Sequence, residues 1–489
     1  MCRPIVEHYF ITRILDLSIL CPAAVFAPTG PGALHAVYNS FSKSSRLPRS
    51  IKTNMTMKIS RFVLIVVLLV FAMPSPAQDL KFEMVRHKTM LDRLVSEVKR
   101  HYFDPEFKGI DIDEKHREAI ANIEKATGVG QLRSAIAQFF AEFNDSHMFF
   151  LPPGHVNNIE YGIDFRMFGE RCVVIYVEKG SDAEKKGLEI GDELRSISGF
   201  TPTRDSLWRV RYFFFVLFPQ PSLKLDVAKP DGRAATYEIE PKVSTGTRVT
   251  QPDPNQIIRD SERNRRLATR QYYYDKFPEA FIWKMPSFSL EPHRVDGIIG
   301  RAKKHPALVF DLRGNGGGRV DMLRRLIGNV FSEDVKVGDE VMRRRTKEMI
   351  AKTRGRNAYT GTIAVLIDAD SGSASEVFSR VIQLEERGLI IGERSAGAVM
   401  ESRVYGQMVG VDVVAVYGAS ITIADLIMKD GKSIEHVGVT PDILIVPTPQ
   451  DIAAKRDIVL ARVLEALGVK VTPEEAYKIF EHTLDGRSE

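Results

Sequence analysis

The sequence predicts a multi-domain protein of the α/β class, and three observations lead to that prediction. A chain of 489 residues is too long for one simple core, so two or three domains are expected. Apolar residues recur at helical spacing in residues 80–150, whereas residues 157–243 alternate short apolar runs with turns. From Phe277 onward, runs typical of buried strands alternate with helical segments.

The segment before these domains has the pattern of a secretory signal peptide. The apolar run 62–73 is preceded by Lys58 and Arg61 and followed by Pro74–Ala77, so cleavage is expected after Ala77. The run is too short to span a bilayer, for which roughly 20 residues are needed. We therefore expect a secreted or periplasmic protein, with membrane contact only through a signal segment left uncleaved.

The signal begins near Met55 or Met57, so we predict a signal peptide at 55–77 and expect residues 1–54 to be an untranslated or non-native extension. The alternative is a genuine cytoplasmic extension ahead of a signal anchor. Up to Ala77 the chain has eight Lys and Arg against two acidic residues, so removing this part lowers the formal net charge from +5 to −1. No basic footprint remains, and no nucleic-acid partner is expected.

Cysteine usage excludes two kinds of site. Cys2 and Cys21 precede the expected cleavage point, which leaves Cys172 alone. A single cysteine can form neither an internal disulfide nor a cysteine-based metal site. Because Cys172 lies in an apolar run, we expect it to be buried. We expect no metal and no cofactor.

Residues 78–153 are predicted to be a helical domain, from apolar residues at helical spacing in two segments. The region ends in a polar turn that contains Ser146 and His147. A histidine between a polar turn and an apolar segment is more often structural. It becomes a candidate base because a serine nucleophile requires a group that accepts its proton.

Residues 154–245 change to short strands and turns. Tyr161-Gly162-Ile163, then a short helix and a Gly-Asp-Glu-Leu turn, follow in an order that resembles a PDZ domain. The resemblance implies that Tyr161, Gly162 and Ile163 form a loop that binds a terminal carboxylate, beside a sheet edge that accepts a peptide strand. The aromatic stretch 208–218 is predicted to be core.

The remaining boundaries follow from composition. Residues 246–276 are polar, with an arginine-rich run over 259–270, and are interpreted as an exposed linker rather than a nucleic-acid arm. The next domain is expected at 277–448. Amphipathic helices are expected in the region 449–489, over residues 451–467 and 473–484, where they suit a cap or a homo-oligomer contact. Within 277–448 the predicted strands include 281–285, 307–312, 389–392, 411–417 and 420–423, and the predicted helices include 294–304 and 320–331.

The stretch 362–387 is the centre of that domain. Ile363–Ile367 predicts a buried strand, a polar turn follows, and apolar residues from Val377 onward repeat at helical spacing. Ser373 stands between strand and helix, where free N–H groups and the helix dipole favour a developing oxyanion. Ser373 is therefore the candidate nucleophile. The alternative is that it only caps the helix, a common use of serine.

A glycine-rich turn, residues 314–318, follows another predicted strand. Glycines in this position let the backbone approach a ligand and present its N–H groups. Phosphate binding is the alternative. However, no Gly-Lys-Ser/Thr follows, and the spacing is not that of a dinucleotide fingerprint.

Three motifs follow one another in this domain: Asp311-Leu312-Arg313 with Gly316-Gly317, Ser371–Glu376, and Gly438–Asp442. The PDZ-like module precedes them. In this order the motifs resemble those of the C-terminal processing peptidases and the related tricorn protease core, a family of serine peptidases. The resemblance implies a crotonase-like layered α/β catalytic domain in which Ser373 is the nucleophile.

The resemblance also separates two branches of the family. One branch uses a Ser-Lys dyad, and here Ala398 stands at the lysine position, so that mechanism is excluded. The tricorn-like branch uses a histidine that a serine precedes and a glutamate just before the Gly-x-x-Pro-Asp motif. Ser146, His147 and Glu435 match that pattern. The resemblance implies His147 as base and Glu435 as its orienter, either directly or through Ser146. His436 is the alternative base.

The oxyanion hole is implied in the same way. The N–H group of Ala374, with that of Gly316 or Gly317, would hold the developing charge. The expected function is a serine endopeptidase acting on peptides or unfolded proteins, with the PDZ-like module gating or feeding chain termini. Two alternatives remain: a non-catalytic binding protein for apolar ligands, or a scaffold that binds peptide termini beside a vestigial second domain.

Overall fold

The computed structural model describes residues 76–154, 157–245, 270–410 and 414–484. The predicted extension, most of the predicted signal peptide and most of the predicted linker lie outside these ranges. Residues Arg86–Glu489 belong to one compact unit. In the described part of the chain, no helix combines the length and the apolar character needed to cross a membrane.

A six-stranded sheet forms the centre of the domain that carries Ser373. Its order is β18-β15-β14-β11-β10-β9. Neighbouring strands are parallel except at the edge, where β9 runs antiparallel to β10. In chain order the strands are β9 (Tyr272–Tyr274), β10 (Ala280–Lys284), β11 (Ala307–Asp311), β14 (Thr362–Ile367), β15 (Leu389–Gly392) and β18 (Ile443–Leu444).

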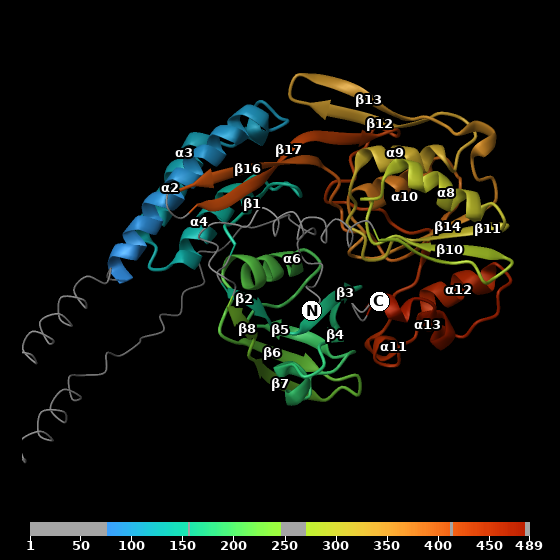
Figure 1. Cartoon of the computed structure of the whole chain (residues 1–489), viewed down its shortest axis with the longest axis horizontal. Coiled ribbons are helices and arrows are strands. Elements are labelled where there is room, and N and C mark those ends of the chain that lie inside the picture. Colours follow the sequence, from blue (N-terminus) through green and yellow to red (C-terminus); the bar gives the residue numbers. More distant parts are fainter. Residues whose placement is uncertain (1–75, 155–156, 246–269, 411–413, 485–489) are drawn as a thin grey trace, which may run out of the picture. The chain divides into compact units, whose positions relative to one another are not determined.

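Helices cover both faces of this sheet (Figure 1). Phe281, Phe310 and Val365 join one apolar cluster with residues of α8, α9 and α10. Ile282 and Val309, each one position away, join another with residues of α12 and α13. Because successive residues of a strand face opposite sides, strands that are apolar throughout are buried on both faces. The helices are α8 (Pro292–Ala302), α9 (Val320–Gly328), α10 (Ala374–Leu384), α12 (Ile458–Ala466) and α13 (Pro473–Leu484).

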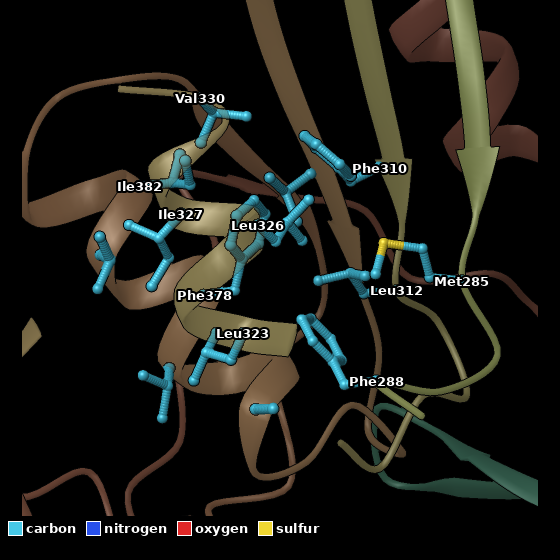
Figure 2. Packing of buried hydrophobic residues seen from close by; sticks show 14 of the residues in the cluster. Met285, Phe288, Phe310, Leu312, Leu323, Leu326, Ile327, Val330, Phe378 and Ile382 are labelled. Carbon is cyan, nitrogen blue, oxygen red and sulfur yellow. The ribbon is translucent and has the colours of Figure 1, made fainter. Parts of the chain in front are cut away.

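The first cluster fixes the helix that begins beside Ser373. Phe378 of α10 packs edge to face on Phe310 of β11, with ring centroids 5.0 Å apart (Figure 2). Such a pair contributes about 0.5–1.5 kcal/mol beyond the area that it buries. Val377 and Ile382 of the same helix are buried in this cluster. The beginning of α10 is therefore held close to the carboxyl ends of the parallel strands.

A second sheet anchors the segment that contains His147. Its order is β1-β17-β12-β13, and β16 also pairs with β17. β1 begins two residues after His147 and pairs with β17 from Phe149 opposite Ser420. The strands are β1 (Phe149–Leu151), β12 (Val335–Met342), β13 (Arg345–Ala351), β16 (Glu401–Val409) and β17 (Ala415–Met428). The N-terminal helices are α2 (Pro76–His101), α3 (Ile112–Lys125) and α4 (Val129–Ala141).

A third sheet, of order β3-β4-β5-β6-β7, forms a small β-rich module. Cys172 is buried in its core, as predicted. Most apolar residues of the stretch 208–218 are also buried, but Phe218 at its end is 42% exposed, so the prediction that this stretch is core is confirmed only in part. Its strands are β3 (Ile163–Phe168), β4 (Arg171–Val177), β5 (Glu193–Ile197), β6 (Leu223–Ala228) and β7 (Ala234–Ile239). Its helices are α5 (Asp182–Lys186) and α6 (Leu207–Arg211), the latter continued by a π-helical turn (Tyr212–Leu217). β2 (Asn157–Glu160) pairs with β8 (Lys242–Thr245).

The structure confirms the α/β, multi-domain class and corrects part of the element prediction. Residues 415–417 and 420–423, expected in two separate strands, belong to one continuous strand, β17, whereas 411–413 lie outside the described residues. The helix expected at 451–467 is two, α11 (Pro449–Ala453) and α12, because Asp457 caps a new helix through the N–H of Leu460. The hairpin β12–β13 and the strand β16 were not predicted.

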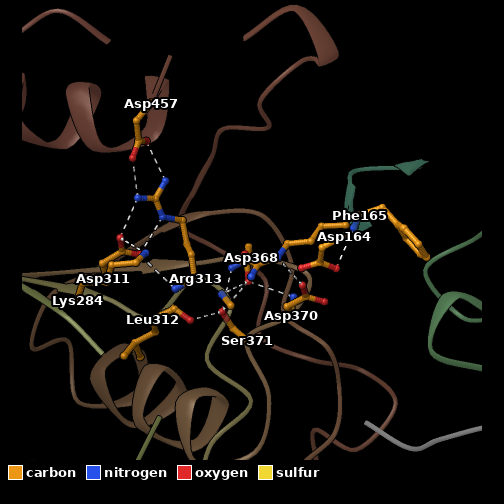
Figure 3. Close-up of polar contacts among 12 residues, drawn as sticks. Asp164, Phe165, Lys284, Asp311, Leu312, Arg313, Asp368, Asp370, Ser371 and Asp457 are labelled. Carbon is orange, nitrogen blue, oxygen red and sulfur yellow. Dashed lines mark hydrogen bonds and ion pairs between the residues drawn. The ribbon is translucent and has the colours of Figure 1, made fainter. Parts of the chain in front are cut away.

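Ion pairs at the end of the six-stranded sheet attach the C-terminal helices. The guanidinium of Arg313 binds Asp311, and it donates two 2.8 Å hydrogen bonds to Asp457 at the start of α12 (Figure 3). Burial raises the pKa of Asp311, but the charges of Arg313 and Lys284 outweigh it and hold that pKa below its ordinary value. This network positions the start of the glycine-rich turn.

Candidate active site

Ser373 lies at a strained turn between β14 and α10. Its backbone has φ +53° and ψ −119°, a region that non-glycine residues rarely adopt. Strain of this kind is maintained only where the surroundings enforce it, and it is typical of sharp strand-to-helix turns that expose a nucleophile. Ser373 is the N-cap residue of α10 in sequence position, as the alternative interpretation expected.

Two hydrogen bonds hold the main chain of Ser373 in place. Its N–H donates to the carbonyl oxygen of Ala398 at 2.6 Å and to Oε2 of Glu376 at 3.0 Å. The N–H of Glu376 donates to the carbonyl oxygen of Ser373 at 2.9 Å. Ser373 and Glu376 also form a capping box, in which the Ser373 side chain faces the Glu376 N–H and the Glu376 carboxylate accepts from the Ser373 N–H. Ser373 therefore caps α10, and this role does not exclude one as nucleophile.

The glycine-rich turn packs directly against Ser373. A Cβ atom on Gly317, whose φ is +102°, would lie 2.6 Å from the Ser373 Cβ and 2.8 Å from the Ala374 nitrogen. Only glycine allows this approach. The Gly317 N–H donates to Oδ1 of Asn315 at 2.9 Å. Among the residues that the structure describes, the N–H groups of Gly316 and Ala374 have no protein acceptor, so of the three oxyanion candidates these two are available.

The structure brings Ser146, His147 and Glu435 together in a chain of hydrogen bonds. The Ser146 hydroxyl lies 2.7 Å from Nδ1 of His147 and 2.9 Å from Oε2 of Glu435. The Ser146 N–H also donates to Oε1 of Glu435 at 2.9 Å. The main-chain N–H of His147 donates to Oδ1 of Asp145 at 3.0 Å. Glu435 therefore reaches His147 only through a hydroxyl.

These distances favour one arrangement of protons. An ionised Glu435 can only accept, so the single proton of the Ser146 hydroxyl points to it. The Ser146 oxygen then accepts from Nδ1–H of His147, which leaves Nε2 unprotonated. This tautomer is the one that a general base requires.

The surroundings shift the pKa values of both ends of this chain. Burial lowers the pKa of the half-buried His147 to about 4, against the opposing charge of Asp145. Burial, and then the charge of Asp145, raises the pKa of Glu435 to about 7, against the hydrogen bonds from Val399 and Ser146. His147 is thus neutral at neutral pH, as a base must be.

One peptide unit connects the two halves of the site. The carbonyl of Ala398 accepts from the Ser373 N–H, and the N–H of Val399, in the same peptide group, donates to Oε2 of Glu435 at 2.9 Å. No hydrogen bond joins His147 to Ser373 in the described part of the chain. Hydrogen bonds between catalytic groups are often loose before substrate binds.

His436, the alternative base, is occupied elsewhere. Its Nε2 lies 3.0 Å from the carbonyl oxygen of Asn144 and 3.6 Å from Oε1 of Glu435. Its backbone has a φ of +61°. The ring nitrogen therefore ties the 435–436 segment to the turn that carries Ser146 and His147.

Sequence reasoning missed the role of Glu376. This residue is fully buried, and its carboxylate accepts from the Ser395 hydroxyl at 2.6 Å and from the N–H groups of Gly397 and Ala398 at 2.6 and 2.8 Å, besides that of Ser373. Burial raises its pKa, and these donors lower it. The Ser-x-x-Glu spacing is that of a capping box and was the available signal.

The β-rich module contacts the same loops. Arg204 donates to Oε2 of Glu393 at 2.7 Å, just before the 395–399 loop. Arg166 lies 3.2 Å from Asp370, in the turn that precedes Ser373; Asp370 and that turn appear in Figure 3. Burial raises the pKa of Glu393 to about 7, against the charge of Arg204. Module and site are therefore connected by ion pairs.

The three residues of the loop predicted to bind a carboxylate, Tyr161, Gly162 and Ile163, differ in their contacts. Tyr161 is buried and its hydroxyl donates to the carbonyl oxygen of Gln220 at 2.6 Å. Gly162, with φ +69°, accepts from the Glu178 N–H at 2.7 Å, and Ile163 begins the edge strand β3. On that strand, the guanidinium of Arg211 donates to the carbonyl oxygen of Phe165.

Comparison with known families identifies the domain. Residues 282–445 match the model of peptidase family S41. The chain carries a peptidase family S41 domain. This S41 domain contains Ser373, Glu376 and Glu435, whereas Ser146 and His147 lie before it in the sequence.

Two curated relatives agree with this assignment. The chain is 25% identical over 324 residues to a tail-specific protease of Haemophilus influenzae, covering 62% of this chain and 44% of the relative. It is 30% identical over 150 residues to a chloroplastic C-terminal processing peptidase of Tetradesmus obliquus, covering 29% of each. The chain thus spans less than half the length of these relatives.

Solved structures share the fold beyond the S41 domain. Mature CPAF in complex with lactacystin superposes with a TM-score of 0.58 at 14% identity, over 83% of this chain and 100% of that one. Another structure of mature CPAF gives 0.59 at 15% identity, over 83% and 99%. At this identity the likeness concerns the fold.

Proposed function

We propose that the chain is a serine endopeptidase in which Ser373 is the nucleophile, His147 the general base and Glu435 its orienter through the Ser146 hydroxyl. The observation that carries this proposal is the continuous hydrogen-bonded chain from Glu435 to Nδ1 of His147, tied to the Ser373 main chain by the 398–399 peptide unit. A purely structural histidine does not require a relay that fixes its tautomer.

The chemistry follows from the proton arrangement. Nε2 of His147 takes the proton of the Ser373 hydroxyl as the oxygen attacks the carbonyl carbon, once substrate has brought the two side chains into contact. Nε2 then gives that proton to the leaving amine, and the acyl-enzyme is hydrolysed by a water that His147 activates in turn. The imidazolium formed in each step is stabilised by Glu435 through Ser146.

The developing oxyanion is assigned to the N–H groups of Gly316 and Ala374. Both are free of protein acceptors among the described residues, and Gly317 brings its turn against Ser373. Each such donor typically contributes about 3 kcal/mol to lowering the barrier. Gly317 is not proposed as a donor, because its own N–H is bound to Asn315. Its contribution is that the absence of a side chain lets the turn pack against Ser373.

No amine takes part in the proposed mechanism. Ala398 stands at the position of the dyad lysine of related enzymes, and its N–H donates to Oε2 of Glu376 at 2.8 Å. The histidine base replaces that amine. The names of the relatives support proteolysis near chain termini, so peptides or unfolded proteins are the proposed substrates. A secreted or periplasmic location is proposed from the signal-peptide pattern at 55–77.

A serine-directed fluorophosphonate probe, followed by mass spectrometry, tests the assignment. We expect labelling of Ser373 in the wild-type protein and none in Ser373→Ala or His147→Ala. Ser222→Ala and His293→Ala are the matched controls and should label as the wild type does, because these residues are remote from the site. A folded wild type that does not label would favour the non-catalytic binding function. Labelling that persists in Ser373→Ala would assign another nucleophile.

A further inference from the structure

A basic hollow lies away from the catalytic groups, where four elements of the second sheet region meet. Its volume is about 470 Å³, within the range of about 300–1,000 Å³ that is typical of small-molecule sites. The end of α2, the β12–β13 hairpin, β16 and β17 all line it. Its lining residues are Arg100, His101, Met342, Arg343, Arg344, Arg345, Arg403, Tyr405 and Ile423.

Side-chain contacts hold the hairpin, the end of α2 and β16 together around the hollow. Arg343 donates to the carbonyl oxygens of Tyr102 at 3.0 Å and Asp104 at 3.3 Å, which attaches the hairpin to the end of α2. The rings of His101 and Tyr405 stack with centroids 4.4 Å apart, which attaches α2 to β16. The hollow is therefore built by the fold rather than by one mobile loop.

The arginines of the hollow are unequally neutralised. Arg100 lies 3.3 Å from Glu97, and Arg343 is engaged with main-chain carbonyls. Within the described ranges, Arg344, Arg345 and Arg403 form no ion pair. Two acids are nearby. Glu340 is 10% exposed and lies 4.0 Å from Lys347, and Glu401 has a pKa that burial raises against the charge of Arg403.

Concentrating these charges costs free energy unless an anion offsets it. Arg343 and Arg344 form the two-residue loop of the hairpin, because Met342 pairs directly with Arg345. Like charges this close repel, and such a concave cationic surface raises the local concentration of anions. Guanidinium groups bind the paired oxygens of phosphate through two parallel hydrogen bonds.

We propose that this hollow binds an anion that presents two or more phosphate groups, either a free polyphosphate or adjacent phosphate head groups of a lipid surface. The guanidinium groups of Arg344, Arg345 and Arg403 carry three positive charges, and a single carboxylate could neutralise only one of them. The volume also exceeds what a single small ion fills. The proposal stands independently of the peptidase function, since none of these residues belongs to the site around Ser373.

Calorimetric titration of the purified protein with inorganic tripolyphosphate tests the proposal. At about 0.15 M salt, where exposed charges are largely screened, the wild type should bind and the double variant Arg344→Glu/Arg403→Glu should bind at least about tenfold more weakly. Arg117→Glu/Arg356→Glu is the control, because it changes the net charge equally at exposed arginines elsewhere. Circular dichroism verifies that both variants fold.

A second arm distinguishes the sources. Co-sedimentation with phosphatidylcholine vesicles that contain phosphatidic acid, compared with vesicles that lack it, measures binding to a lipid surface. Binding of either phosphate probe that is lost only in the Arg344/Arg403 variant supports the proposal, and the probe that binds identifies the source. Three results overturn it: no binding of either probe, equal loss in the control variant, or a glutamate-rich peptide that binds as tightly as tripolyphosphate.

Discussion

Two buried glutamates flank the loop of residues 395–399, and they differ in what they hold. Glu376 accepts from the Ser395 hydroxyl and from three main-chain N–H groups, all within the S41 domain. Glu435 accepts from the same loop through Val399, but the other hydrogen bonds to its carboxylate come from Ser146, in a distant part of the chain. Burial raises the pKa of both carboxyls.

The difference indicates that burial and a raised pKa do not by themselves mark a catalytic group. Both features are common to functional sites and to structural networks. Glu435 differs because it is hydrogen-bonded to the Ser146 hydroxyl and, through it, to the imidazole of His147. A change in the charge of Glu435 would therefore reach Nε2 of His147, the proposed base. We therefore expect changes at Glu376 to act on folding and changes at Glu435 to act on turnover.

The largest effect is expected from Glu435→Gln. The amide cannot stabilise the imidazolium, so kcat/KM for an unstructured peptide should fall about 10³–10⁴-fold, as in other triads that lose their acid. The melting temperature should change little. Glu401→Gln, at another acid whose pKa burial raises, is the matched control and should retain turnover. Equal turnover in both variants would remove Glu435 from the mechanism.

Glu376→Ala should act mainly on stability. It leaves several buried donors without an acceptor, and each costs about 1–3 kcal/mol, so the free energy of unfolding should fall by at least about 3 kcal/mol. Urea denaturation followed by circular dichroism measures this. Glu385→Ala, at the partly exposed C-cap of the same helix, removes only an ion pair with Lys429 and should cost under about 1 kcal/mol. A Glu376→Ala protein as stable as the control would contradict the structural role.

Ser146→Ala tests whether the relay needs the hydroxyl. Removing it separates Glu435 from His147, and we expect kcat to fall about 10–100-fold, less than on loss of the acid because water can bridge the gap. Ser146→Thr keeps the hydroxyl and should recover most of the rate. An alanine variant with full kcat would show that Glu435 acts without Ser146.

The smallest effect is on pH dependence. The wild-type kcat/KM should decline as pH falls through about 7, because protonation of Glu435 removes the charge that supports the imidazolium. In Glu435→Gln this limb should disappear, which leaves the protonation of His147 near pH 4. A wild-type profile that is flat between pH 5 and 8 would exclude this coupling.

The sequence predicted the strand–turn–helix around Ser373 because short apolar runs and helical spacing are local signals. It did not predict the hairpin β12–β13, because the two-residue loop is Arg343-Arg344 rather than one of the glycine-containing pairs that usually signal a hairpin, and because most of β13 is polar and exposed. The long strand β17 was divided in two because a change of hydrophobicity within a strand resembles a turn. Glu376 was overlooked because a buried acceptor and a helix cap have the same local pattern.

The candidate site was predicted residue by residue from family motifs, and the structure adds what motifs cannot carry. No sequence spacing indicates that Gly317 N–H is bound to Asn315, so Gly316 and Gly317 could not be separated as donors. Likewise, whether Glu435 meets His147 directly or through Ser146 depends on how β1 and β17 pair.

The peptide group between residues 398 and 399 makes both connections. Its carbonyl oxygen accepts from the N–H of Ser373, and its N–H donates to the carboxylate of Glu435. Rotating that plane would break both hydrogen bonds at the same moment, so we expect the two halves of the proposed site to be lost together. A ligand or partner that turned this peptide group would then switch the proposed activity off in one step rather than by degrees.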